Sequence, residues 1–340
     1  MQIKLFDYKL PDGRIAQKPV SPRDHSRLLF LNKKNGQISH CHFYDLPEIL
    51  QPGDVLVLNE TKVFPARLIG RKNSGGKVEL FLLKPLKNGL WQCLIGGRRL
   101  RAGQTILFAK GLKAELVSGV NTKIKIVKFN YKNSKLNTLI AQLGHTPLPP
   151  YIKTPDSQKI RKSYQTVFAK TSGSVAAPTA GLHFTPQLLK KLKSQGVKIF
   201  KITLHVGWGT FAPVSVSDIT KHQIHREWVS ISPAAARALN LLKKQGRRII
   251  AVGTTTTRAL EAMTRNKKLI SGEQDVDIYI YPGYKFKFIN SLITNFHLPQ
   301  SSLLFLVCAL AGQKNILRAY NIAVRRKYRF YSFGDAMFIN

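Results

Sequence analysis

The sequence predicts an α/β main domain into which a smaller antiparallel β-barrel-like domain is inserted. In the second half of the chain, segments typical of buried strands alternate with amphipathic segments, as in βαβ units. Between residues 67 and 164, short alternating runs are separated by glycine-rich turns, a pattern typical of small barrels and sandwiches. A chain of 340 residues accommodates both, and we expect domains at 1–66 plus 165–340 and at 67–164.

The first 65 residues are expected to supply two buried strands to the main domain. Residues 27–31 are typical of a buried strand, and a Lys-Asn-Gly turn lets residues 37–43 pair back with it. A short helix is expected at 46–50. Residues 54–59 form the second buried strand, which ends in polar side chains.

The inserted segment is expected to be a barrel with a basic surface. Residues 67–170 contain 21 Lys and Arg and three acidic residues, a surplus of +18. The proline-rich stretch 144–155 is interpreted as the linker back to the main domain. The expected strands cover residues 78–83, 91–95, 105–108, 114–118 and 123–128.

After Gly181 the pattern predicts alternating helices and strands. Proline near the start of a segment and glycine after its end mark several of the helices. The expected helices cover residues 186–195, 232–245, 257–264, 303–311 and 316–327. The expected strands cover residues 197–206, 248–252, 278–281 and 286–294.

The charge balance favours a nucleic-acid partner. The chain carries 54 Lys and Arg against 17 Asp and Glu, a formal net charge of +37. Such a field concentrates polyanions near the surface. A genome-wide drift toward lysine codons is the alternative explanation, and both can hold.

The cysteines and the hydropathy of the chain indicate the cellular compartment in which the protein is expected. Cys41, Cys93 and Cys308 form no CxxC or Cys/His ligand pattern, which favours a reducing compartment over a disulfide framework or a zinc site. The longest apolar stretch, residues 303–311, is too short to span a bilayer. We therefore expect a cytoplasmic protein without a membrane partner, and a monomer.

One segment stands out against this basic background. Residues 173–185 read GSVAAPTAGLHFT, thirteen residues without a charge. Small side chains in series let a backbone approach a ligand or another element closely. His183 is the titratable side chain in this run, which makes the run the first candidate for chemistry.

Polar or small clusters follow four of the expected strands. They begin at Asn59, His205, Gly253 and Thr294. Ligands in open α/β sheets bind outside the carboxyl ends of strands, so the clusters predict one shared pocket. The run from Gly253 to Arg258 opens a helix, where free N–H groups and hydroxyls hold an anion or a ribose; an ordinary helix cap is the alternative.

Other cofactor classes are disfavoured by missing motifs. No GK[ST] follows a glycine-rich loop and no GxGxxG occurs, which argues against a nucleoside-triphosphate or NAD enzyme. His222 and His225 would share one face of a helix, but they do not form HExxH, so we expect no metal.

At these clusters the chain resembles the S-adenosylmethionine:tRNA ribosyltransferase-isomerase family of the queuosine pathway. The resemblance runs in order from end to end. Trp208, Ile224 and the pair Thr256-Thr257 depart conservatively from the family pattern. The matching residues are 10–11, 15–17, 23–24, 26–29, 52–54, 59, 61, 65–68, 164–167, 173–185, 205–211, 222, 225, 254–255, 258, 281–283, 294–299, 328–330 and 334–337.

The resemblance implies a specific reaction. The family transfers the ribosyl group of S-adenosylmethionine to 7-aminomethyl-7-deazaguanine at the wobble position of tRNA. Isomerisation gives epoxyqueuosine, with adenine and methionine released. S-adenosylmethionine is thus a co-substrate, and no permanently bound cofactor is implied.

Within this reaction the sequence supports a set of site hypotheses. The sulfonium acidifies the C5′ hydrogens, and histidine suits a general base near neutral pH, so His183 or His297 is the expected base. Glu227 and Asp335 are the expected partners of the methionine ammonium or the substrate amine. The residues expected to hold the donor are Asn59, Thr61, Ala180, Gly181, Gly207, Gly209, Thr254, Thr255 and Asn295. The residues expected to contact RNA phosphates are Arg67, Arg98, Arg99 and Arg258.

Two other classes of function remain open from the residues alone. A methyltransferase or other S-adenosylmethionine-dependent tRNA modifier is disfavoured because no glycine-rich first strand–loop with a following acidic residue is visible. A non-catalytic RNA-binding protein fits the charge, but it gives no reason for polar clusters at four strand ends.

Overall fold

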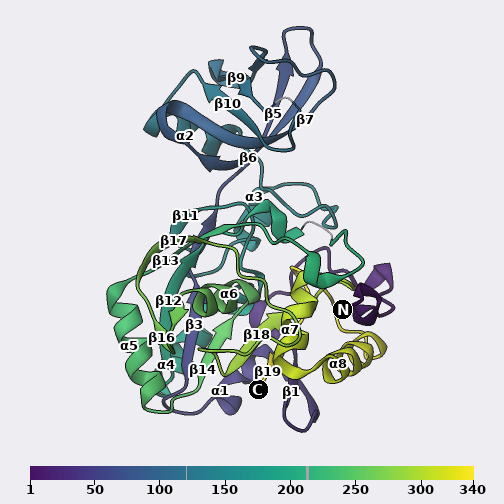
Figure 1. Ribbon diagram of the computed structural model, residues 1–340, viewed down its shortest axis with the longest axis vertical. Helices are drawn as coiled ribbons and strands as arrows, with labels where there is room; N and C mark the ends of the chain where they lie inside the picture. The colour runs from purple at the N-terminus through teal and green to yellow at the C-terminus, as the bar shows by residue number, and fades with distance from the viewer. Residues whose placement is uncertain (120, 212–213) are drawn as a thin grey trace.

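The larger part of the chain is built on a mixed nine-stranded sheet (Figure 1). The computed structural model describes residues 1–119, 121–211 and 214–340. The centre of the sheet holds the parallel strands β12 (Lys198–Leu204), β3 (Val55–Asn59), β14 (Ile249–Val252) and β18 (Ser291–Asn295). Every residue of β3, β14 and β18 is buried, as expected for parallel strands covered on both faces.

The outer strands make the sheet mixed. On one side, β13 (Glu227–Ile231) and β17 (Gly272–Val276) continue the sheet in antiparallel order from β12. On the other side, β19 (Ala336–Ile339) is antiparallel to β18, and β1 (Arg27–Leu31) and β2 (Ile38–His42) follow it. Consequently the starts of β19 and β1 lie at the same edge as the end of β18.

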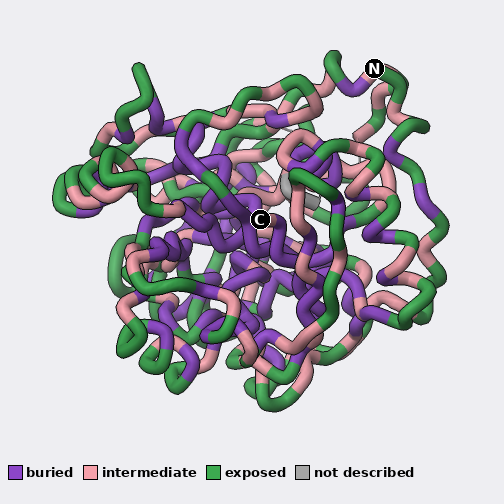
Figure 2. The backbone as a smooth tube through the Cα atoms, turned by 90° about the horizontal axis from the view of Figure 1, so that it is seen from below, coloured by how far each residue is buried: buried purple, intermediate pink, exposed green. Residues whose placement is uncertain are grey.

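Helices cover both faces of this sheet, and the period-2 alternation of the strands assigns side chains to each face. Val55 and Val57 belong to the core beneath α5 (Pro233–Lys244), α6 (Thr254–Ala262), α7 (Ser302–Ala311) and α8 (Gln313–Arg325). Leu56 and Leu58 belong to the core beneath α1 (Leu46–Ile49) and α4 (Pro186–Ser194). The buried segments accordingly gather in the middle of the molecule (Figure 2).

The inserted segment forms a closed six-stranded antiparallel barrel with the strand order β10-β7-β6-β5-β8-β9. Alternate residues such as Val78, Leu80 and Leu82 are fully buried in its core, and α2 (Asn133–Leu143) packs Leu136 and Ile140 against them. The barrel extends from one end of the main body (Figure 1). Its strands are β5 (Arg67–Lys72), β6 (Lys77–Pro85), β7 (Leu90–Gly96), β8 (Thr105–Leu107), β9 (Lys113–Ser118) and β10 (Lys125–Phe129).

The chain enters and leaves the barrel side by side. β4 (Thr61–Val63) leads in, β11 (Thr171–Ser174) follows α3 (Gln158–Ser163) on the way out, and β4 and β11 pair in parallel. Lys84 pairs with Asp275 of β17 at 3.2 Å, which adds a contact between the barrel and the main body. We propose to keep the domain boundaries at 1–66 plus 165–340 and at 67–164.

The predicted fold class is confirmed, but several elements differ from expectation. The elements that the sequence did not predict are the strands β4, β5, β11, β13, β17 and β19, the helices α2 and α3, and the small hairpin of β15 (Thr264–Arg265) and β16 (Lys268–Leu269). Residues 278–281, expected to form a strand, are irregular; the Ile278 carbonyl accepts from the Arg258 side chain (3.3 Å) and not from a neighbouring strand. Strand β18 begins only at Ser291 because the preceding N–H groups bond the Glu261 carboxylate.

Within the described residues, no single helix has the length and apolar composition needed to cross a membrane. The pair α7 and α8 passes that test only when taken together, and the two helices are bent by 116° relative to each other.

We predict that Glu261→Gln destabilises the main body. The carboxylate is fully buried and accepts from the N–H groups of Lys287, Phe288 and Ile289 at 2.7–3.0 Å. The substitution removes the charge from these bonds and turns one acceptor into a donor, at a cost of about 2–4 kcal/mol. Urea unfolding followed by circular dichroism measures the loss.

The exposed Glu273 provides the control, because Glu273→Gln should change the free energy of unfolding by less than about 0.5 kcal/mol. Equal urea midpoints for Glu261→Gln and the wild-type chain would contradict the structural role of the carboxylate.

Candidate active site

A cavity of about 530 Å³ lies at the carboxyl edge of the parallel strands. Its walls come from the junction of β14 and α6, the end of β18, residues 177–180 of the uncharged run and residues 298–303, which lead into the first turn of α7. The parallel topology brings these distant segments together. Of the four predicted strand-end clusters, those that begin at Gly253 and Thr294 line the cavity, the one at His205 does so through Val206, and the one at Asn59 does not within the described residues. No Asp, Glu, Lys or Arg lines the cavity within the described residues.

The threonine run at the start of α6 divides into two pairs. Thr254 and Thr255 line the cavity, whereas Thr256 and Thr257 donate their hydroxyls to the backbone carbonyls of Val252 and Gly253, at 2.6 and 3.2 Å. The N-terminus of α7, which follows Ser301, opens at the same cavity. Two helix N-termini therefore direct their positive ends at one space.

Asn295, at the end of β18, is a cavity residue whose amide orientation is determined by its neighbours. Its Nδ2 donates to the Tyr331 carbonyl at 3.0 Å, so this atom is the nitrogen of the amide. The same Nδ2 lies 3.2 Å from Nε2 of His183. Oδ1 is buried and has no hydrogen-bond partner within the described residues.

His183 lies behind Asn295 and does not line the large cavity within the described residues. Its Nδ1 is 2.7 Å from the Ser26 hydroxyl, and its ring stacks on Phe43. Because Asn295 donates to Nε2, the proton of the neutral ring is on Nδ1. Burial lowers the pKa of His183 to about 4, with nearby Asp335 opposing this shift.

His297 follows β18 and lines the cavity. Its Nε2 is 3.0 Å from the Thr294 hydroxyl, and Nδ1 has no hydrogen-bond partner within the described residues. Its backbone is held by two buried tyrosines, with the Tyr8 hydroxyl donating to the carbonyl and the N–H donating to the Tyr320 hydroxyl (3.1 Å). Burial lowers the pKa of His297 to about 3, so the ring is neutral near pH 7.

The two acids expected at the site are engaged elsewhere. Glu227 pairs with Arg258 at 2.7 Å, and both side chains are almost fully buried. Asp335 accepts from the backbone N–H groups of Arg27 (3.0 Å) and Arg329 (2.8 Å), and it also pairs with both guanidinium groups. Neither acid lines the cavity in the described part of the chain. We therefore reassign both carboxylates to holding the backbone around the site.

Several residues expected to hold the donor instead build the scaffold. The Asn59 amide bonds both backbone groups of Leu204 at 2.9 and 3.0 Å and accepts from the Thr61 N–H at 3.1 Å. The Thr61 hydroxyl is 2.8 Å from Nδ1 of His205. Asn59 reaches the cavity wall only through Thr255, at 3.4 Å.

Three glycines from the same group contact neighbouring side chains: Gly181 and Gly209 leave space for an aromatic ring, and Gly207 makes a backbone hydrogen bond. A Cβ on Gly181 would lie 2.8 Å from the Phe168 ring, and one on Gly209 would lie 2.0 Å from the His225 ring. The N–H of Gly207 donates to Glu227 at 3.2 Å. Ala180, Thr254, Thr255 and Asn295 are the predicted donor residues that line the cavity, together with His297.

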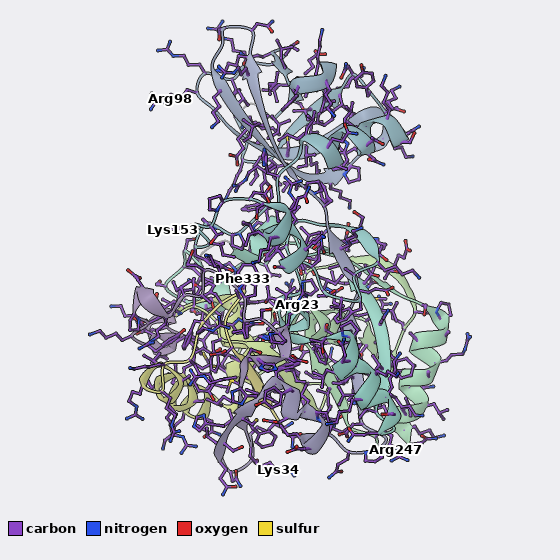
Figure 3. All side chains as sticks on the ribbon, turned by 180° about the vertical axis from the view of Figure 1, so that it is seen from behind. Arg23, Lys34, Arg98, Lys153, Arg247 and Phe333 are labelled. Atoms are coloured by element: carbon purple, nitrogen blue, oxygen red, sulfur yellow. The ribbon has the colours of Figure 1, made fainter. Side chains whose placement is uncertain are left out.

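The arginines expected to contact RNA lie in two settings. Arg98 and Arg99 are exposed on the barrel after β7, and Arg98 projects outward there (Figure 3). Arg67 is half-exposed and pairs with Glu79 at 3.0 Å. Arg258 is only 4% exposed and holds Glu227, so we do not retain it as a phosphate contact.

The sequence reading missed three residues at the cavity: Tyr151, Tyr331 and Ser332. The two tyrosine rings lie 4.2 Å apart, and the Tyr151 hydroxyl is 2.7 Å from the Ser332 hydroxyl. Tyr151 lies in the segment interpreted as a linker. Tyr331 and Ser332 lie between two segments that carry the family resemblance, residues 328–330 and 334–337, and this proximity is the one sequence signal for them.

His222 and His225 do not share a helical face, because residues 222–226 are irregular. The His222 ring contacts Tyr279 and the His225 ring contacts Trp208. In the described ranges, no three His, Cys, Asp or Glu side chains are grouped as metal ligands.

Comparison with known proteins gives one consistent result. The model of the family described as queuosine biosynthesis protein matches residues 3–339. The chain is 52% identical to S-adenosylmethionine:tRNA ribosyltransferase-isomerases of Moorella thermoacetica and Desulfitobacterium hafniense, and covers 100% of each protein. A crystal structure of S-adenosylmethionine tRNA ribosyltransferase from Thermotoga maritima is 36% identical with a TM-score of 0.56, covering 99% of this chain and 100% of that one.

The cavity at the strand ends, the separate barrel and these full-length matches agree with the resemblance read from the sequence motifs. The chain belongs to the queuosine biosynthesis protein family.

Proposed function

We propose that this enzyme transfers the ribosyl group of S-adenosylmethionine to 7-aminomethyl-7-deazaguanine at the wobble position of tRNA. Isomerisation then gives epoxyqueuosine, and adenine and methionine leave. The observation that carries the proposal is the cavity itself, which combines two helix N-termini, an aromatic wall and a neutral histidine at one sheet edge. Its volume, about 530 Å³, is in the range of small-molecule sites.

The adenosyl part of the donor occupies this cavity. Thr254, Thr255 and Asn295 offer polar groups to its hydroxyls and ring nitrogens, and Ala180 leaves room for close approach of the backbone. Tyr151 and Tyr331 provide flat apolar surface for an aromatic base. S-adenosylmethionine is consumed as a co-substrate, and the enzyme requires no permanently bound cofactor.

His297 is the proposed general base. Its neutral imidazole accepts a proton from C5′ of the donor, which the adjacent sulfonium makes acidic, and an electron pair remains on that carbon. That pair forms a C4′=C5′ double bond as the ring bond C4′–O4′ breaks, and the released oxygen forms a carbonyl at C1′ as the bond to adenine breaks; the imidazolium can return the proton to the departing base. The amine of the modified guanine adds to C4′, the electron pair that this places on C5′ bonds to C1′, and the resulting alkoxide displaces methionine from C5′ to form the epoxide.

The tRNA lies on the barrel in this proposal. The barrel segment carries the basic surplus, and β3 and β4 connect it directly to the sheet edge that forms the cavity. Arg98 and Arg99 contact backbone phosphates, which position the RNA without reading its sequence. The enzyme acts as a cytoplasmic monomer.

Product analysis separates this function from the alternatives. The protein is incubated with S-adenosylmethionine and tRNA that carries the 7-aminomethyl-7-deazaguanine precursor. Adenine plus methionine supports the proposal. Release of S-adenosylhomocysteine would identify a methyltransferase, and tRNA binding without turnover would identify an RNA-binding protein.

We predict that His297→Gln lowers kcat by a factor of about 10²–10⁴, the usual contribution of a general base. Gln keeps a polar group beside Thr294 but does not accept a proton near pH 7. Steady-state adenine release measures kcat, and tRNA affinity measured by filter binding should stay unchanged. A kcat within threefold of wild type would remove His297 from this role.

We predict that kcat does not fall between pH 7 and pH 5.5, as it would if the base were a histidine with an ordinary pKa. Burial lowers the pKa of His297 to about 3, so the unprotonated form that acts as base is fully populated above pH 5. A base with a pKa near 6.5 would instead lose activity progressively as pH falls below about 7. We expect kcat to be flat between pH 5.5 and 8; a half-maximum near pH 6.5 would contradict the assignment.

The affinity for tRNA should fall steeply with salt, because phosphate contacts release counterions. We predict that Arg98→Ser with Arg99→Ser lowers the slope of log K against log salt by about 2, roughly one for each lost phosphate contact. Filter binding at several salt concentrations gives the slope.

The matched control is Arg237→Ser with Lys244→Ser, two exposed cations on α5, which Figure 1 shows away from the barrel. This pair should leave the slope nearly unchanged. Equal effects of the two double variants would mean that the barrel arginines contact no phosphate.

A further inference from the structure

Asn295 and His183 form a buried unit at the cavity wall, and the proposed function uses Asn295 but gives His183 no role. Asn295 is 2% exposed and His183 is 4% exposed. A buried polar side chain normally satisfies all of its hydrogen-bonding atoms. In this pair every ring and amide nitrogen has a partner, and Oδ1 of Asn295 has none within the described residues.

Two hydrogen bonds fix the orientation of the Asn295 amide. One hydrogen of Nδ2 goes to the Tyr331 carbonyl at 3.0 Å, and the other goes to Nε2 of His183 at 3.2 Å. A flipped amide would place its oxygen against the Tyr331 carbonyl and against the unprotonated ring nitrogen. Both contacts would then join two acceptors, so the flipped state is disfavoured.

The rest of the structure holds the two partners of the amide in place. His183 donates Nδ1–H to the Ser26 hydroxyl at 2.7 Å and stacks on the Phe43 ring. Tyr331 has a φ of 71°, in the left-handed region that a tyrosine adopts at a cost in free energy. This conformation starts the turn in which the Tyr331 carbonyl also accepts from the N–H of Gly334, at 2.9 Å.

We propose that His183 is a positioning residue and that Asn295 is the group it positions. The unit presents Oδ1 as a single fixed acceptor, which takes a hydrogen bond from an O–H or N–H donor of the adenosyl group of S-adenosylmethionine. This inference rests on the proposed function, because it requires the donor in this cavity. It also replaces the expectation that His183 is the base.

A positioning role and a base role predict different kinetics. If His183 only locks the amide, its loss weakens donor binding, so KM for S-adenosylmethionine rises and kcat stays nearly constant. If His183 accepts the proton, its loss lowers kcat by orders of magnitude with little change in KM.

The experiment compares four variants at saturating precursor tRNA: His183→Leu, His183→Gln, Asn295→Ala and the double variant His183→Leu with Asn295→Ala. We expect KM to rise about tenfold or more in His183→Leu and in Asn295→Ala, with kcat within about threefold of wild type. His183→Gln retains an acceptor for the Asn295 amide and should restore KM to within about threefold. The double variant should be no worse than Asn295→Ala, because both changes remove one interaction.

His40→Leu is the matched control. This histidine also makes one short ring contact, from Nδ1 to the Tyr328 hydroxyl at 2.7 Å, and burial lowers its pKa as well. It does not line the cavity within the described residues, so KM for S-adenosylmethionine should not change. Thermal unfolding of every variant checks that the fold is retained.

Donor analogues identify the group that Oδ1 contacts. Analogues that lack the 2′-hydroxyl, the 3′-hydroxyl or the 6-amino group are tested as inhibitors of wild-type enzyme and of Asn295→Ala. The analogue without the contacted group should bind wild type at least about tenfold more weakly than the parent donor, and Asn295→Ala should lose this discrimination.

Three results would overturn the inference. These are a large kcat loss with unchanged KM in His183→Leu, additive effects in the double variant, or equal discrimination by wild type and Asn295→Ala for every analogue. Failure of the proposed function looks different, since the wild-type enzyme would then release no adenine or methionine from S-adenosylmethionine.

Discussion

Two buried asparagine side chains determine the shape of the sheet edge on which the site depends. Where parallel strands end, their last backbone groups lose ladder partners, and a buried unpaired group costs about 1–3 kcal/mol. Asn59 supplies those partners between β3 and β12, and Asn295 supplies one for the turn after Phe330. Without these hydrogen bonds, the segments that line the cavity would have no fixed spacing. The two asparagine amides therefore hold the fold and the candidate site in one arrangement.

Charge is divided sharply between the surface and the cavity. The chain has a formal net charge of +37, yet no charged side chain lines the cavity within the described residues. The acidic residues in this part of the main body hold neighbouring groups in place. Glu227 pairs with Arg258, and Asp335 pairs with the arginines beside it. Glu261 accepts hydrogen bonds from three backbone N–H groups. The basic surface attracts a polyanion, whereas the cavity proposed for the cationic donor has no lysine or arginine side chain in its wall within the described residues.

Much of the fold could be predicted because its signals are local. The buried runs of β3 and β14, the proline and serine starts of α4 and α5, and the turn spacing of the barrel are all set by neighbouring residues. The missed strands β13 and β19 lack such signals, since their pairing depends on partners far along the chain. The strand expected at 278–281 failed for the converse reason: its residues are β-branched and aromatic types that favour strands, but no strand within the described residues pairs with them.

For the site, the sequence by itself determined the family, the cavity-forming clusters and the residue types available for chemistry. Polar residues that follow an expected strand can be recognised in the sequence alone. This signal identified four residues that line the cavity: Thr254, Thr255, Asn295 and His297. Only the tertiary structure decided which of them face the cavity. His183, Glu227 and Asp335 are indistinguishable from active groups in sequence, and their burial against Asn295, Arg258 and Arg27 is the basis on which we propose that they support the site. The physical reason is that burial and hydrogen-bond partners come from separate segments of the chain, which only the folded structure brings into contact.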